Sequence, residues 1–161
     1  MNQVVIIFAT GYASWWMILR MWRRPKVAFR AFSARMARII LWADISHCSV
    51  CVGDRVLDKQ MSGPAYWPLH KYLKHYPTLS HAYIVPTPLP ASFQHIHIGG
   101  PIRSLQVIHK WVTNGRRGTD DCVGLTVAVL RDAGIEIPKR VFSPKRLDVW
   151  MGRKGFRRID L

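Results

Sequence analysis

The sequence predicts an α+β domain in which a small antiparallel sheet packs against a helix that begins at a cysteine. Three observations lead to this prediction: an apolar helical stripe follows Cys122, a β-hairpin is centred on residues 50–58, and 49% of the chain is hydrophobic. That hydrophobic content excludes a disordered polypeptide. A length of 161 residues fits one domain. We therefore expect a single domain over residues 1–161, with residues 1–44 forming an N-terminal strand and basic, Trp-rich helices.

The first residues predict a buried strand followed by a helix. The apolar run from Val4 to Thr10 ends at Gly11, and Ser14 can cap a helix from Trp15 to Arg24. A membrane span is the rival interpretation, but the uncharged run is shorter than the roughly 20 residues that a spanning helix needs. A signal peptide fits poorly, because its positive charge should precede the apolar run and here it follows. We favour the strand and helix.

The N-terminal helix also has features of a helix that lies at a membrane surface. Trp15, Trp16 and Trp22 stand beside arginines, and indole rings with cations favour contact with anionic lipid headgroups. Packing in the core is the alternative for these three side chains. A second helix is predicted over residues 27–42, because its apolar residues share one face. It leads the chain toward His47.

Residues 50–58 predict a hairpin of two short strands joined by a turn at residues 53–55. The period of two in a strand places His47, Ser49 and Cys51 on one face. The returning strand brings Asp58 toward the level of His47. The hairpin therefore predicts a histidine with a carboxylate beside it.

The middle of the chain predicts the rest of the sheet and two helices. The expected elements are a turn at 61–64, a helix over 69–76, strands over 81–86 and 94–98, and a helix over 102–113. His95 and His97 share a strand face and could be combined with Cys48 and Cys51 as zinc ligands. We expect no metal site and no cofactor, because Cys48 and Cys51 point to opposite faces of an extended strand.

The stretch from Thr119 to Pro138 predicts a helix with Cys122 in its first turn. Thr119 or Asp120 can cap it, and Gly134 can end it. The N–H groups and the dipole of a first turn favour a thiolate and can hold an oxyanion. A small core residue is the alternative role for this cysteine. After this helix we expect a short helix from Ser143 to about Trp150 and an edge strand over 155–161.

A cysteine at a helix start, a histidine on a strand and a polar group beside the histidine are the parts that thiol hydrolysis needs. The run Asp-Cys-Val-Gly-Leu at 121–125, followed by Asp-Ala-Gly-Ile at 132–135, resembles the signature around the nucleophile of NlpC-type papain-like peptidases. Residues 46–54 are similar to the histidine strand of that family. Because His47 precedes Cys122, the resemblance is to the circularly permuted branch, which includes YiiX-like proteins and the lecithin-retinol-acyltransferase group.

The resemblance implies a papain-like fold in which Cys122 is the nucleophile, His47 the general base and Asp58 the third polar member. Two departures from the family pattern are Val123, where the family has serine, and a turn before Asp58 that is one residue shorter. The candidate substrate-binding residues are Arg116, Arg117, Ser49 and Asp121. Asp121 has helix capping as its alternative role.

The resemblance implies an amide bond in peptidoglycan stem peptides as the substrate, as a bacteriophage lysis or entry protein would require. Its permuted branch equally implies lipid esters or acyl amides, with hydrolysis or acyl transfer as the reaction. A catalytically inactive basic protein that binds membrane or nucleic acid is the contrasting hypothesis.

The charge of the chain favours an anionic partner. There are 24 Lys and Arg residues against 9 Asp and Glu residues, which gives a formal net charge of +15. Peptidoglycan or another anionic envelope polymer, a phospholipid surface and nucleic acid all fit this charge. No nucleic-acid-binding motif supports the last of these. The three cysteines show no disulfide pattern and suit free thiols.

Overall fold

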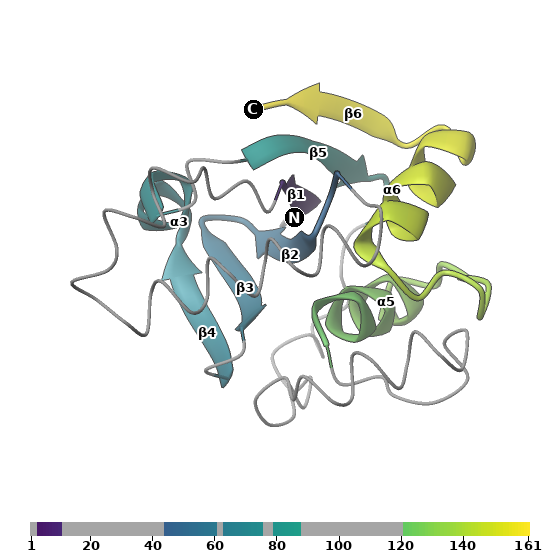
Figure 1. The fold of residues 1–161 in the computed structure, drawn as a ribbon, viewed down its shortest axis with the longest axis horizontal. Helices are drawn as coiled ribbons and strands as arrows, with labels where there is room; N and C mark the ends of the chain where they lie inside the picture. Colours follow the sequence, from purple (N-terminus) through teal and green to yellow (C-terminus); the bar gives the residue numbers. More distant parts are fainter. Residues whose placement is uncertain (1–2, 11–43, 61–62, 76–78, 88–120) are drawn as a thin grey trace.

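The computed structural model describes residues 3–10, 44–60, 63–75, 79–87 and 121–161. Within these ranges the chain forms a mixed α/β fold with a six-stranded antiparallel sheet and three helices (Figure 1). The expected combination of a small antiparallel sheet with packed helices is confirmed. The helices expected over 15–24, 27–42 and 102–113 and the strand expected over 94–98 lie outside the described residues.

The sheet has the strand order β4-β3-β2-β1-β5-β6, and every neighbouring pair is antiparallel. The strands are β1 (Val4–Ala9), β2 (His47–Val52), β3 (Arg55–Gln60), β4 (Gly63–Pro68), β5 (Leu79–Val85) and β6 (Arg157–Asp160). The N-terminal strand thus lies in the interior of the sheet, between β2 and β5. Its continuous apolar sequence suits a strand that is covered on both faces.

The expected N-terminal strand is therefore confirmed as β1. Because Val4–Ala9 pairs on both sides in the sheet, one continuous membrane-spanning helix cannot begin at Val4. Among the residues that the structure describes, no helix combines the length and apolar character that crossing a bilayer requires.

The predicted hairpin is confirmed and is longer than expected. Val52 pairs with Arg55, so the turn between β2 and β3 contains only Gly53 and Asp54. Gly53 has a φ of 61°, a left-handed conformation that tight hairpin turns require and glycine adopts readily. The turn expected over 61–64 is partly wrong, because Gly63 is already in β4. Prolines hid this strand from sequence reasoning, but they are tolerated at the edge of a sheet, which is where β4 lies.

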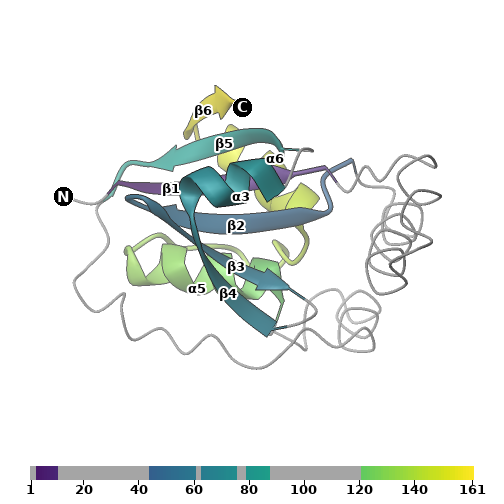
Figure 2. The same cartoon turned by 90° about the vertical axis from the view of Figure 1, so that its left-hand side faces the viewer.

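The three helices of the described residues cover the two faces of the sheet. Helix α3 (Leu69–His75) lies on one side of it, and α5 (Cys122–Asp132) and α6 (Pro144–Arg153) lie on the other (Figure 1). Figure 2 shows α5 running alongside β2. The helices predicted to start at Leu69, at Cys122 and after Ser143 are all confirmed, as is the C-terminal edge strand, now β6.

The alternation of buried side chains along the strands produces two apolar layers. The larger layer lies between the sheet and helices α5 and α6, and includes Ile6, Val50, Val129 and Leu147. The smaller layer lies beneath α3 and consists of Ile7, Cys51, Val56, Tyr72 and Ala82. Successive residues of one strand therefore face different helices. Cys48 and Val50 of β2 therefore lie in the layer of α5, and Cys51 lies in the layer of α3.

Candidate active site

Cys122 is the first residue of helix α5, and Asp121 is its N-cap. An oxygen of Asp121, Oδ1, accepts a hydrogen bond from the backbone N–H of Gly124 at 2.7 Å. The cap expected at Thr119 or Asp120 is thus corrected by one or two positions. Capping satisfies one of the N–H groups that the first turn leaves without an intrahelical acceptor, so it fixes where the helix begins. It also fixes the position of the Cys122 side chain.

His47 and Asp58 meet through their side chains. His47 Nε2 and Asp58 Oδ1 are 2.5 Å apart, and they come from neighbouring strands, β2 and β3. The imidazole is 20% exposed, whereas the carboxylate is completely buried. A buried carboxylate bonded to Nε2 fixes the orientation of the ring and leaves Nδ1 as the ring nitrogen for a proton from a thiol. The predicted position of Asp58 beside His47 is confirmed.

The thiol of Cys122 lies within interaction distance of His47. The pKa of Cys122 is well below the usual value, because a hydrogen bond from Cys48 stabilises the thiolate and the charge of His47 adds to this effect, although burial opposes it. Burial alone would lower the pKa of His47, but the charges of the Cys122 thiolate and the Asp58 carboxylate raise it well above the usual value. Cys122 and His47 thus favour a thiolate–imidazolium pair.

Cys48 is a site residue that sequence reasoning missed. Its side chain belongs to the same apolar layer as Cys122, and its Sγ lies 3.4 Å from Thr126 Oγ1. Thr126 is one turn along α5 and donates to the carbonyl oxygen of Cys122 at 2.9 Å. Through Thr126, Cys48 is therefore placed close to the start of α5. The alternation of β2 indicated that Cys48 and Cys51 face opposite ways, but not which of the two faces the helix.

Ser49 does not occupy a substrate-binding position. It is completely buried, and its hydroxyl donates to the hydroxyl of Tyr72 at 2.8 Å, on the α3 side of the sheet. This location corrects the expectation of a substrate contact. Tyr72 is a second residue that sequence reasoning missed: burial raises the pKa of its hydroxyl, and the nearby charge of Asp58 raises it further. Ser49 and Tyr72 therefore form a neutral hydrogen-bonded pair near Asp58.

The other expected binding residues have different outcomes. Asp121 is the helix cap described above, which was its alternative role. Arg116 and Arg117 lie outside the described residues. Cys48 and Cys51 lie in different apolar layers, as the strand alternation predicted. In the described part of the chain, no three His, Cys, Asp or Glu side chains are grouped so as to hold a metal ion.

A second histidine–carboxylate pair lies elsewhere in the fold. His81 Nε2 is 2.8 Å from Asp148 Oδ1, and the hydroxyl of Tyr83 donates to the same oxygen at 3.1 Å. These side chains join β5 to α6 and are largely buried. The three cysteines of the chain all lie on β2 and α5. The two histidine–carboxylate pairs therefore differ in chemistry, because only the His47 pair has been placed against a thiol.

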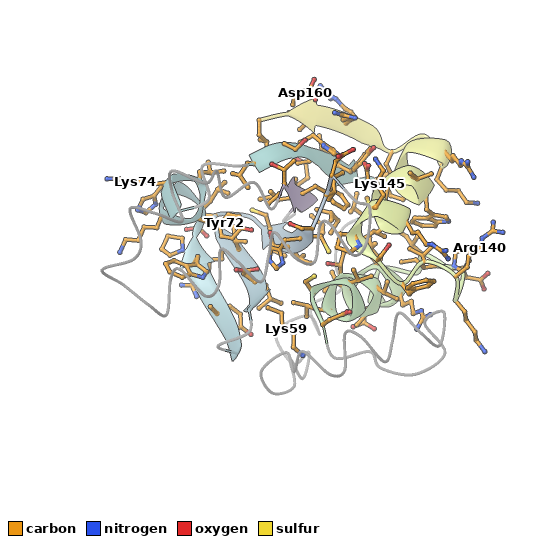
Figure 3. All side chains as sticks on the ribbon, in the orientation of Figure 1. Lys59, Tyr72, Lys74, Arg140, Lys145 and Asp160 are labelled. Atoms are coloured by element: carbon orange, nitrogen blue, oxygen red, sulfur yellow. The ribbon has the colours of Figure 1, made fainter. Side chains whose placement is uncertain are left out.

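Exposed basic side chains extend from several elements. Lys74 and Arg140 project outward on opposite sides of the molecule, whereas Tyr72 points from α3 toward the sheet (Figure 3). The exposed cations of residues 121–161 are Arg131, Lys139, Arg140, Arg146, Arg153, Lys154, Arg157 and Arg158. Their number fits the strong positive charge of the whole chain, and gives the molecule a surface that attracts anions.

Comparison of the chain with protein-family models, with curated proteins and with solved structures gives no match. The chemistry of the site is therefore argued from its own geometry. An antiparallel sheet presents an imidazole oriented by a buried carboxylate, and a helix presents a thiol from its first turn.

Proposed function

We propose that the protein is a cysteine hydrolase that forms an acyl-enzyme on Cys122. The observation that carries this proposal is the meeting of three side chains from three elements: Cys122 from α5, His47 from β2 and Asp58 from β3. A thiolate favoured at neutral pH is a strong nucleophile, and an adjacent imidazolium can protonate a leaving group.

Each group has a defined step in the proposed reaction. The Cys122 thiolate attacks the carbonyl carbon of an amide, and the carbonyl π electrons move to the oxygen. Backbone N–H groups of the first turn of α5 stabilise this oxyanion. The intermediate collapses to a thioester as His47 Nδ1–H protonates the departing amine. His47 then removes a proton from water, which attacks the thioester and releases the acid and the Cys122 thiolate.

We further propose a circularly permuted papain-like architecture. The histidine strand precedes the cysteine helix in the chain, yet α5 packs on the sheet so that its first turn reaches the start of β2. This arrangement, together with the resemblance of residues 46–54 and 121–135 to the NlpC-type signatures, supports the architecture. The completely buried Asp58 supports its role as the third member of the triad.

An amide bond in the stem peptide of peptidoglycan is the substrate that we favour. The charge of +15 and the exposed cations on α6 and β6 suit adsorption to an anionic bacterial envelope. Adsorption concentrates the enzyme on a polymer that cannot diffuse to it. Amide hydrolysis releases one new primary amine for each bond cleaved.

Digestion of purified peptidoglycan tests the proposal. The wild-type protein should release amines and shortened muropeptides, detected by amine labelling and mass spectrometry, whereas Cys122→Ala should release none. Cys51→Ala is the matched control, because Cys51 lies in the other apolar layer, and it should retain activity. A parallel panel of phospholipid vesicles should yield no free fatty acid. Fatty acid release from vesicles without amine release from peptidoglycan would assign a lipid ester substrate instead, and no Cys122-dependent product from either would reject the enzyme.

A further inference from the structure

The catalytic thiol has a second thiol beside it. Cys48 projects from β2 toward α5 and lies in the same apolar layer as Cys122. Cys48 Sγ lies 3.4 Å from Thr126 Oγ1, and Thr126, one turn after Cys122 on α5, donates to the carbonyl oxygen of Cys122 at 2.9 Å. Cys48 takes no chemical step in the proposed hydrolysis, where its thiol only helps to stabilise the Cys122 thiolate.

The two sulfurs differ in their access to solvent. Cys122 is 8% exposed and Cys48 is 1% exposed. A small oxidant can therefore reach the Cys122 sulfur more easily than the Cys48 sulfur. The third cysteine, Cys51, faces the opposite layer and points its Sγ at the carbonyl oxygen of Gly53. Cys51 thus provides an internal control for a thiol of the same strand outside the site.

We propose that Cys48 and Cys122 form a peroxide-reactive pair, in which Cys122 is oxidised first and Cys48 then closes an intramolecular disulfide. The pair would reversibly switch off hydrolysis and protect the nucleophile from irreversible oxidation. This inference rests on the proposed function, because it concerns regulation of the same nucleophile and needs an activated Cys122.

The chemistry takes two steps with hydrogen peroxide as the oxidant. The Cys122 thiolate attacks one peroxide oxygen, an S–O bond forms, the O–O bond breaks and hydroxide leaves, which gives a sulfenic acid. Cys48 sulfur then attacks the Cys122 sulfur, an S–S bond forms, and the S–O bond breaks. The proton of the Cys48 thiol leaves with the hydroxyl group as water. The two sulfurs together lose two electrons, which reduce the peroxide. The hydroxide takes up the proton that Cys122 released when it became a thiolate, so the peroxide ends as two molecules of water.

The protonation states support this division of roles. Burial raises the pKa of Cys48 well above the usual value, and the hydrogen bond with Cys122 raises it further. Cys48 therefore remains a thiol and is a poor target for peroxide. Its proton becomes the one that departs with the sulfenic hydroxyl group. Cys51 is also held as a thiol, because burial and the charge of Asp54 raise its pKa to about 11.

Peptide mapping of the oxidised full-length protein tests the pair. The wild type is treated with hydrogen peroxide, its remaining thiols are blocked under denaturing conditions, and it is digested without reduction. We expect a peptide that joins Cys48 to Cys122, with Cys51 blocked, and its loss after dithiothreitol. Cys51→Ala should give the same linked peptide. The proposal would be overturned if Cys122 is oxidised while Cys48 is found blocked as a free thiol. It would also be overturned if Cys51 is crosslinked as often as Cys48.

Cys48→Ala adds a second measurement if this variant folds. Its Cys122 should accumulate sulfenic acid that dimedone traps, and prolonged peroxide should carry it to sulfinic acid, which dithiothreitol does not reverse. Activity after dithiothreitol, relative to untreated protein of the same variant, should return for wild type and not for Cys48→Ala. Equal recovery in both would count against the protective role. Peptide mapping of the wild-type protein shows whether the disulfide forms, even if Cys48→Ala fails to fold.

The outcomes separate this inference from the proposed function. A reversible Cys48–Cys122 disulfide in a protein that hydrolyses no substrate would support the redox pair and reject the hydrolase. Hydrolysis by a protein that forms no such disulfide would support the hydrolase and reject the redox pair.

Discussion

His47 Nε2 lies 2.5 Å from Asp58 Oδ1, and both residues lie beyond the backbone pair Val50–Leu57 of their strands. The contact between these two side chains thus joins β2 to β3 near the first turn of α5. The carboxylate is buried and the imidazole is partly exposed. This relationship gives the ring a fixed orientation beside Cys122, which is the feature that the mechanism needs most.

Removing the carboxylate should impair the reaction more than the fold. In Asp58→Ala the imidazole loses its orienting acceptor, and we expect kcat/KM to fall by about 100-fold, near the lower end of the range for acid–base groups. The pKa of His47 should also fall, because one of the charges that raise it is lost. Steady-state kinetics with an amide substrate measures both effects. Asp54→Asn, on the exposed turn of the same hairpin, is the control and should match wild type. An Asp58→Ala enzyme with unchanged kinetics would remove Asp58 from the triad.

Alkylation by iodoacetamide should report the thiolate–imidazolium pair. Because the pKa of Cys122 is lowered, its thiolate forms as pH rises through a value well below that of an ordinary thiol, and labelling should already be fast at neutral pH. Labelling of Cys48 and Cys51 should stay slow, because their pKa values are raised. His47→Ala should move the onset for Cys122 to higher pH. Equal labelling rates for all three cysteines at neutral pH would contradict the activated pair.

The activity profile should be bell-shaped in pH. The acid limb follows formation of the Cys122 thiolate and the alkaline limb follows loss of the proton from His47, whose pKa is raised. Activity should therefore be highest across neutral pH. The pH dependence of kcat/KM gives both limbs for the free enzyme. A profile that rises to a plateau only above the pKa of an ordinary thiol would show that Cys122 is not activated.

The second histidine–carboxylate pair should affect stability rather than chemistry. Asp148→Ala removes the acceptor of His81 and Tyr83, and leaving buried polar groups unsatisfied costs about 1–3 kcal/mol. Urea unfolding should show this loss, while kcat of the folded fraction stays close to that of wild type. Asp160→Ala, at an exposed pair with Arg158, is the control and should change the free energy of unfolding by less than about 0.5 kcal/mol. A large loss of kcat in folded Asp148→Ala would mean that this pair also acts on the site.

The caps of α5 and α6 together test whether the α5 cap positions Cys122. Asp121→Ala and Ser143→Ala each remove a cap whose side chain accepts a backbone N–H, and each should cost about 1 kcal/mol in the free energy of unfolding. Only Asp121→Ala should also lower kcat, because frayed residues at the start of α5 displace Cys122. Asp121→Ser should restore both properties. An equal loss of kcat in the two alanine variants would assign the effect to general destabilisation.

Much of the local structure could be predicted from the sequence. The apolar run at the N-terminus, the glycine at the β2–β3 turn and the serine before α6 are local signals, and each corresponds to an observed element. Strand β4 was missed because its prolines look like a turn, although the edge of a sheet accommodates them. The cap of α5 was misplaced because three adjacent residues are all of a type that can cap a helix, whereas the cap is Asp121, whose Oδ1 accepts the N–H of Gly124.

The sequence by itself determined that Cys122 starts a helix and that Asp58 lies near His47, because a helix cap and a two-residue turn act over a few residues. Only the tertiary structure decided that α5 packs on the face of β2 that carries Cys48. This choice brought two sulfurs together and placed Ser49 and Tyr72 on the other side. The alternation of side chains along a strand separates its two faces, but it does not predict which face a distant helix will cover. That choice depends on the burial of the whole apolar layer.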